Sequence, residues 1–129
     1  MSVALTDAGE LLLRQVHPTF VDEGGRITSQ AFTPTGNHDG ALSVARGSLV
    51  SAQEATEFHR TTGRKSEGTW AVTVGEAHLQ GTKCVEDPSG PSNVEQAHAL
   101  ICFSGSTNER KKVGQVLARF ARDRGRLFP

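Results

Sequence analysis

Apolar and polar residues alternate most strictly at residues 69–74, where Trp70, Val72 and Val74 alternate with threonine and alanine. A period of two places successive side chains on opposite faces of a strand, so the pattern predicts a strand with these three residues facing the core. The run at 97–103 is apolar almost throughout and predicts a second strand, buried on both faces. A short alternation at 41–45 predicts a third strand.

Two segments near the N-terminus give weaker signals. Residues 11–16 fit a strand and a helix capped by Thr6 or Asp7 about equally well, and the pattern leaves both open. Pro18 biases His17 away from helical angles, so the chain is extended at that point. After the turn signal at residues 22–25, residues 26–32 alternate and predict a strand that could form a hairpin with 41–45.

Two helices are predicted from their ends. Ser51 and Glu54 have the spacing of a capping box, and Gly63 is placed to end that helix in a left-handed conformation. This helix, at about 51–62, is expected to pack through Phe58, with His59 on the same apolar side as a hydrogen-bonded core histidine.

The second predicted helix, at about 107–124, starts from a capping box between Ser106 and Glu109 and ends before Gly125. Its apolar stripe predicts the face that packs on the core, and it comprises Val113, Val116, Leu117, Phe120 and Ala121. The tail after Gly125 is expected to fold back onto the domain.

These elements predict a single small α+β domain spanning residues 1–129, with a mixed or antiparallel sheet of about four to five strands and two main helices. A length of 129 residues with 36% hydrophobic content suits one modest core. The segment from 81 to 93 is rich in proline, glycine and serine and is predicted to be a long surface loop. The region 97–103 also holds His98, which we expect to be a core histidine.

Composition narrows the class of protein. No apolar run approaches the length of a membrane span and no secretory leader is visible, so we expect a cytosolic protein with no membrane association. Cys84 and Cys102 are the only cysteines, and we expect both to be buried, reduced thiols. The formal net charge is zero, but residues 106–129 carry seven basic and two acidic side chains. That asymmetry could guide a partner.

The densest group of reactive and conformationally special residues is the segment from 14 to 32. Turn chemistry explains its proline, glycines and acidic pair, whereas no local rule explains Arg14, His17 and Ser29. These three are therefore candidate catalytic residues. His38 and Asp39 are further candidates, because adjacent His and Asp on a loop could form a general base with its orienting carboxylate or a pair of metal ligands. The alternative is that Asp39 only makes a turn with its neighbours.

Several familiar sites are excluded by spacing. The five histidines and two cysteines form no H-x-x-x-H, C-x-x-C or H-E-x-x-H pattern, so no metal site is predicted. Neither a G-x-x-x-x-G-K-[ST] nor a G-x-G-x-x-G phosphate loop is present. Ser29 has no G-x-S-x-G elbow, and neither cysteine has a neighbour that would lower its pKa. No cofactor follows from these patterns.

Three scattered positions resemble the order of residues in ADP-ribosyltransferases, which bind NAD in a split β-sheet. They are Arg14 or His17 on an early strand, Thr28-Ser29 with Phe32, and a later glutamate, either Glu76 or Glu95. The resemblance implies a small NAD-dependent transferase. The chain departs from the family pattern because it has no Ser-Thr-Ser triplet, no tyrosine and no paired glutamate motif.

The last helix favours a different class, a binding module. Its expected outer side carries four cations that could contact an acidic protein surface or phosphates, namely Lys111, Lys112, Arg119 and Arg122. Low aromatic content, 5%, argues against base stacking and so against nucleic acid. The sequence therefore predicts an interaction or regulatory protein that binds a partner protein, less favourably nucleic acid. The alternative is a small enzyme with a site around His17, Ser29 and the pair at 38 and 39.

Overall fold

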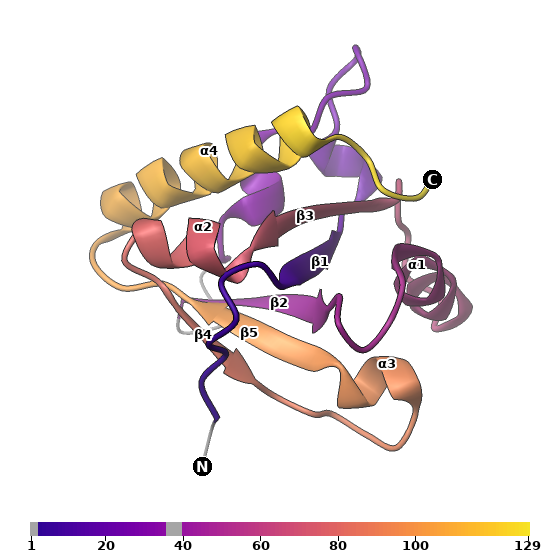
Figure 1. Ribbon diagram of the computed structural model, residues 1–129. Coiled ribbons are helices and arrows are strands. Elements are labelled where there is room, and N and C mark those ends of the chain that lie inside the picture. The colour runs from indigo at the N-terminus through magenta and orange to yellow at the C-terminus, as the bar shows by residue number, and fades with distance from the viewer. Residues whose placement is uncertain (1–2, 36–39) are drawn as a thin grey trace.

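The computed structural model describes residues 3–35 and 40–129 and shows one antiparallel five-stranded sheet with helices on both faces (Figure 1). The strands are β1 (Leu11–Gln15), β2 (Ala41–Arg46), β3 (Thr69–Thr73), β4 (Lys83–Glu86) and β5 (His98–Cys102), in the spatial order β3-β1-β2-β5-β4. The helices are α1 (Ala52–Thr61), α2 (Val74–Leu79), α3 (Asn93–Gln96) and α4 (Thr107–Arg124), with short 3-10 helices η1 (Pro18–Phe20) and η2 (Ser29–Phe32). The predicted α+β class, strand number and two main helices are confirmed.

The two faces of the sheet carry separate clusters of apolar side chains. On the face covered by α4, α2 and η2 the larger cluster is built around Leu12, Phe32, Val72, Ile101 and Leu117. On the face covered by α1 and α3 the smaller cluster contains mainly alanines beside Leu13 and Val50. Because small side chains fill this second layer thinly, its surface remains hollowed between the two helices.

The predicted ends of both main helices are confirmed. The hydroxyl of Ser51 and of Ser106 accepts the backbone N–H of the glutamate three residues later. The carboxylate of that glutamate in turn accepts the backbone N–H of the serine. Gly63 (φ +88°) and Gly125 (φ +91°) follow these helices with the positive φ that glycine adopts without strain. The helical spans therefore follow directly from local chemistry.

The same capping chemistry starts two helices that the sequence patterns did not predict. Thr73 and Glu76 form a reciprocal capping box at the start of α2, and Ser92 and Glu95 form one at the start of α3. The prediction of one long loop at 81–93 is wrong, because β4 pairs with β5 over its whole length and α3 follows it. No helix in the described ranges combines the length and the apolar character needed to cross a membrane.

The strand predicted at 26–32 is also wrong. The Asp22 carboxylate accepts hydrogen bonds from the backbone N–H groups of Gly24 and Arg26, which closes a turn. The turn brings Ile27 opposite Val21, where the two residues form an isolated β-bridge. The chain then coils into η2, whose Ala31 and Phe32 are fully buried. The predicted hairpin with 41–45 does not form, since β2 pairs with β1 and β5.

The ambiguous segment at 11–16 is the strand β1, and the sheet splits beside it. β1 pairs with β3 from Leu11 to Gln15, but it pairs with β2 only at Leu12–Arg46 and Leu13–Ala45. Beyond Leu13 the described parts of β1 and β2 diverge, because the next residues of β2 pair with β5 alone. A gap therefore opens in the middle of the sheet.

The C-terminal tail folds back as predicted and covers the edge strand β3. Leu127 N–H donates to the Thr69 carbonyl at 2.8 Å, and Thr69 N–H donates to the Phe128 carbonyl at 2.9 Å. The Arg126 guanidinium lies 5.8 Å from the ring centroid of Trp70. The tail therefore pairs with one end of the edge strand, at Thr69.

Candidate functional site

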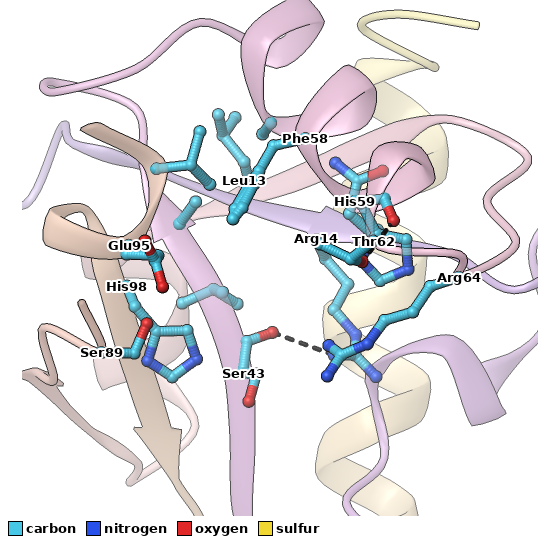
Figure 2. A pocket seen from close by; sticks show the side chains of 15 residues that line it. Leu13, Arg14, Ser43, Phe58, His59, Thr62, Arg64, Ser89, Glu95 and His98 are labelled. Atoms are coloured by element: carbon cyan, nitrogen blue, oxygen red, sulfur yellow. Dashed lines mark hydrogen bonds between the residues drawn. The ribbon is translucent and has the colours of Figure 1, made fainter. Parts of the chain in front are cut away.

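A cleft of about 330 Å³ lies on the hollowed face, between α1 and the segment that leads into β5 (Figure 2). Its floor is the sheet itself, where Leu13, Ser43 and Ala45 lie on either side of the split. One wall comes from α1 and the residues after it, and it includes Phe58, His59, Thr62 and Arg64. The opposite wall includes Ser89, Val94, Glu95 and His98.

Arg14 fills the split between β1 and β2. Its Nε donates to the Ala31 carbonyl at 3.0 Å, and a terminal nitrogen donates to the Ser43 carbonyl at 2.9 Å. Burial lowers the pKa of the guanidinium to about 10, so Arg14 remains charged at neutral pH. The sequence candidate Arg14 therefore lies in the cleft, where it links two strands and η2.

A second arginine and a histidine lie at the same end of the cleft. Burial lowers the pKa of the half-buried His59 imidazole, and the nearby charges of Arg64 and Arg14 lower it further. Figure 2 shows the side chains of Arg14, His59 and Arg64 gathered at one end of the cleft. Within residues 3–35 and 40–129, no carboxylate forms an ion pair with Arg14 or Arg64.

The opposite wall is weakly acidic and hydrogen-bonded. One carboxylate oxygen of Glu95 accepts the Ser92 N–H at 3.1 Å as part of the cap of α3. The Nδ1 atom of His98 lies 3.0 Å from a carboxylate oxygen of Asp87. The two walls therefore place opposite charges across an apolar floor.

A second hollow continues from the basic end of the cleft. It shares Arg14, His59 and Arg64 with the cleft and adds His17, Phe20 and Lys65. The His17 Nδ1 atom accepts the Thr19 N–H at 3.1 Å, and its ring meets Phe20 edge to face at a centroid distance of 6.3 Å. His17 thus lines this second hollow together with Arg14, and it also caps η1.

The other candidates from the sequence lie elsewhere. Ser29 begins η2, its carbonyl accepts the Thr33 hydroxyl at 2.8 Å, and it does not line the cleft. His38 and Asp39 lie outside the described residues. Among the residues that are described, the structure brings Arg14 and His17 together and leaves Ser29 apart.

The basic face expected on α4 is reduced to three residues. Lys111, Lys112 and Arg119 are exposed. Arg122 is half-buried, and its guanidinium donates to the Ile27 carbonyl at 3.0 Å instead of projecting from the outer side. This correction follows from the turn at residues 22–27, which brings an unpaired carbonyl within reach of the helix.

Neither cysteine is activated as a nucleophile. Burial, with a smaller effect of the nearby Cys102, raises the pKa of the Cys84 thiol to about 11. The pKa of Cys102 is also raised, chiefly by burial. In the described ranges both thiols are free and no three His, Cys, Asp or Glu side chains lie together as a metal site would need.

The sequence patterns missed His59, Arg64 and His98 as cleft residues, whereas Glu95 was named by the resemblance to ADP-ribosyltransferases. The two histidines were expected in the core, but both are half-buried, and His98 occupies the less buried side of β5. The strand is therefore not buried on both faces. A local signal that could have pointed to a site at His59 is its place on the apolar side of α1, one helical turn before Gly63, Arg64 and Lys65.

The positions that resemble ADP-ribosyltransferases are only partly brought together. Arg14 and Glu95 line the same cleft, above a split in the sheet. Thr28 and Ser29 lie at the start of η2, and Glu76 forms an ion pair with Arg124 at 2.9 Å. Neither the scan against protein-family models nor the searches of curated proteins and of solved structures finds a match to this chain.

Proposed function

We propose that the protein binds a small anionic ligand in the cleft above the split sheet. The observation that carries this proposal is the cluster of Arg14, His59 and Arg64 at one end of the cleft, with no carboxylate paired to either arginine in the described part of the chain. A buried cation without a counter-ion is costly, and a bound anion would offset that cost.

The shape and chemistry of the cleft support this class of ligand. A guanidinium presents paired N–H donors that match a carboxylate or a phosphate. The floor at Leu13 and Ala45 and the neighbouring Phe58 suit an apolar portion of the ligand, and Glu95 and His98 offer polar groups on the opposite wall. The ligand is therefore expected to be amphipathic, with its anionic end at Arg14.

The proposal is tested by thermal shift and calorimetric titration with inorganic phosphate, pyrophosphate and NAD as separate probes. Phosphate at one hundred times its dissociation constant should stabilise the wild-type fold by about 2.7 kcal/mol. Arg64→Gln should abolish most of that stabilisation because it removes an exposed cation of the cleft, while the matched control Lys111→Gln on α4 should retain it. NAD in the same panel tests the resemblance to ADP-ribosyltransferases.

Two results would contradict the proposal. One is the absence of any stabilisation by phosphate or pyrophosphate at low ionic strength. The other is equal stabilisation of wild type and Arg64→Gln, because binding would then be occurring on another surface.

A second candidate function is the binding of an acidic partner protein by α4. The supporting observation is that Lys111, Lys112 and Arg119 are exposed, without an ion pair in the described residues. Polyglutamate and a short DNA duplex serve as separate probes. Triple charge reversal to glutamate at these positions should weaken polyglutamate binding at least tenfold. Unchanged binding, or preference for the duplex, would count against a protein partner.

A further inference from the structure

Asp87 and His98 form a pair across the antiparallel ladder just beyond the last residues of β4. Asp87 N–H donates to the His98 carbonyl at 2.9 Å, which continues the register set by Glu86 and Ala99. The His98 Nδ1 atom lies 2.9 Å from the Asp87 carbonyl oxygen and 3.0 Å from its carboxylate Oδ2. The backbone and the side chain of Asp87 therefore both fix the imidazole.

These contacts select one tautomer of the imidazole. A carbonyl oxygen and a carboxylate oxygen can only accept hydrogen bonds, so the Nδ1 atom of His98 carries the proton. In the neutral ring the Nε2 atom then has a free lone pair and can act as a base. The Asp87 carboxylate would stabilise the positive charge that forms when Nε2 takes up a proton.

The His98 ring also faces the cleft. His98 is half-buried and lines the cleft next to Ala45, its cross-strand neighbour on β2. Figure 2 shows the His98 ring reaching into the cleft from one wall, while Arg14 and Arg64 reach in from the other. The charged and titratable groups around the cleft are Glu95 on the same wall and Arg14, His59 and Arg64 on the opposite wall.

We infer that His98 is the general base of this cleft, positioned by Asp87, and that the substrate class is a phosphate monoester with an apolar alcohol portion. This inference rests on the proposed anionic ligand. The cationic end would hold the phosphate, and the apolar floor would hold the alcohol portion. Water is the second reactant.

The reaction balances with the groups present. The Nε2 atom of His98 takes a proton from water, and the water oxygen forms a bond to phosphorus. The bond from phosphorus to the ester oxygen breaks in line with the attack, the leaving oxygen keeps the electron pair and takes a proton from bulk water, and Nε2 then releases its proton to solvent. The products are inorganic phosphate and an alcohol, while Arg14 and Arg64 offset the negative charge on the phosphoryl oxygens.

The test uses phenyl phosphate as substrate and measures the inorganic phosphate released. His98→Gln should lower kcat by about 10²–10⁴-fold, the usual contribution of a general base. Its stabilisation by inorganic phosphate should be retained, which shows that the variant is folded and its anion site intact. The matched control His78→Gln, at an exposed position on α2, should leave kcat unchanged.

Asp87 is tested as a positioning residue. Asp87→Asn keeps an acceptor oxygen but loses the charge, so kcat should fall with little change in KM. In the wild-type protein, the ¹⁵N chemical shifts of His98 should report a proton on Nδ1.

The outcomes separate this inference from the proposed function. If phosphate stabilises the protein but phenyl phosphate is not hydrolysed above the buffer rate, the anion site stands and the role of His98 is overturned. A rate that is unchanged in His98→Gln, or a ring protonated on Nε2, overturns it as well. If phosphate does not bind at all, the proposed function and this inference both fail.

Discussion

Gly114 lies where α4 crosses η2, and replacing it with alanine should destabilise the fold. A Cβ atom at this position would overlap the Thr33 hydroxyl and lie 3.2 Å from the Phe32 carbonyl oxygen. The Thr33 hydroxyl donates to the Ser29 carbonyl at 2.8 Å, so it can rotate away only by giving up that bond. The crossing of these two elements therefore depends on the missing side chain.

The size of the effect follows from three contributions. Glycine to alanine within a helix normally gains about 1 kcal/mol. Overpacking of a tight contact costs about 1–3 kcal/mol, and loss of the Thr33 hydrogen bond costs about 1 kcal/mol. The net expectation for Gly114→Ala is a loss of about 1–3 kcal/mol in the free energy of unfolding, or about 3–5 °C in Tm for each kcal/mol at this chain length.

Urea denaturation followed by tryptophan fluorescence measures this loss, because the single tryptophan, Trp70, is buried in the core. Thr33→Ala removes the hydroxyl that the new Cβ would meet, so the double variant should be more stable than the sum of the single changes by about 1 kcal/mol or more. The reasoning is refuted if Gly114→Ala stabilises the protein, as it would at an open helical position. Strict additivity in the double variant would refute it too.

Three further expectations concern single side chains. The folded pKa of His59 lies below its ordinary value of 6.5, so its contribution to stability is fully present above that pH and is lost as pH falls toward the folded pKa. His59→Gln should therefore flatten this part of the curve of unfolding free energy against pH. Arg124→Met removes hydrogen bonds to the Glu76 carboxylate and the Ala71 carbonyl and should cost about 1–2 kcal/mol in chemical denaturation, and a Tm equal to wild type would contradict this. Leu117→Ala, in the fully buried part of α4, should cost about 2–5 kcal/mol, and a loss below 1 kcal/mol would show that α4 is not packed as described.

Local signals in the sequence were sufficient for much of the fold. The caps at Ser51 and Ser106 set the starts of α1 and α4, since a hydroxyl that satisfies a free N–H acts within a few residues. The alternation at 69–74 predicted β3, although Val74 begins α2. Both short helices carry the same capping spacing, but neither has enough turns to show an apolar period, so the patterns did not single them out.

The failures come from tertiary contacts. Residues 26–32 alternate like a strand, but burial of Ala31 and Phe32 under α4 favours a 3-10 turn. The cleft likewise depends on the sheet register and on the packing of α1, which bring Arg14, His59 and His98 from separate elements to one face. Arg14 was singled out because no local rule explained it and because of the resemblance to ADP-ribosyltransferases, whereas nothing near His98 in the sequence indicates its partner Asp87.

The split beside Arg14 divides the sheet into two parts that pair with each other over a short stretch. One part is β3 with β1 and the other is β2 with β5 and β4. Among the described residues the two parts pair at Leu12–Arg46 and Leu13–Ala45, and the Arg14 guanidinium adds a hydrogen bond to the Ser43 carbonyl. Helix α1 packs on the first part, β3 with β1, whereas His98 lies on β5 in the second part. A ligand bound in the cleft would therefore contact both parts of the sheet, and the stiffness of the whole sheet would depend on whether the cleft is occupied.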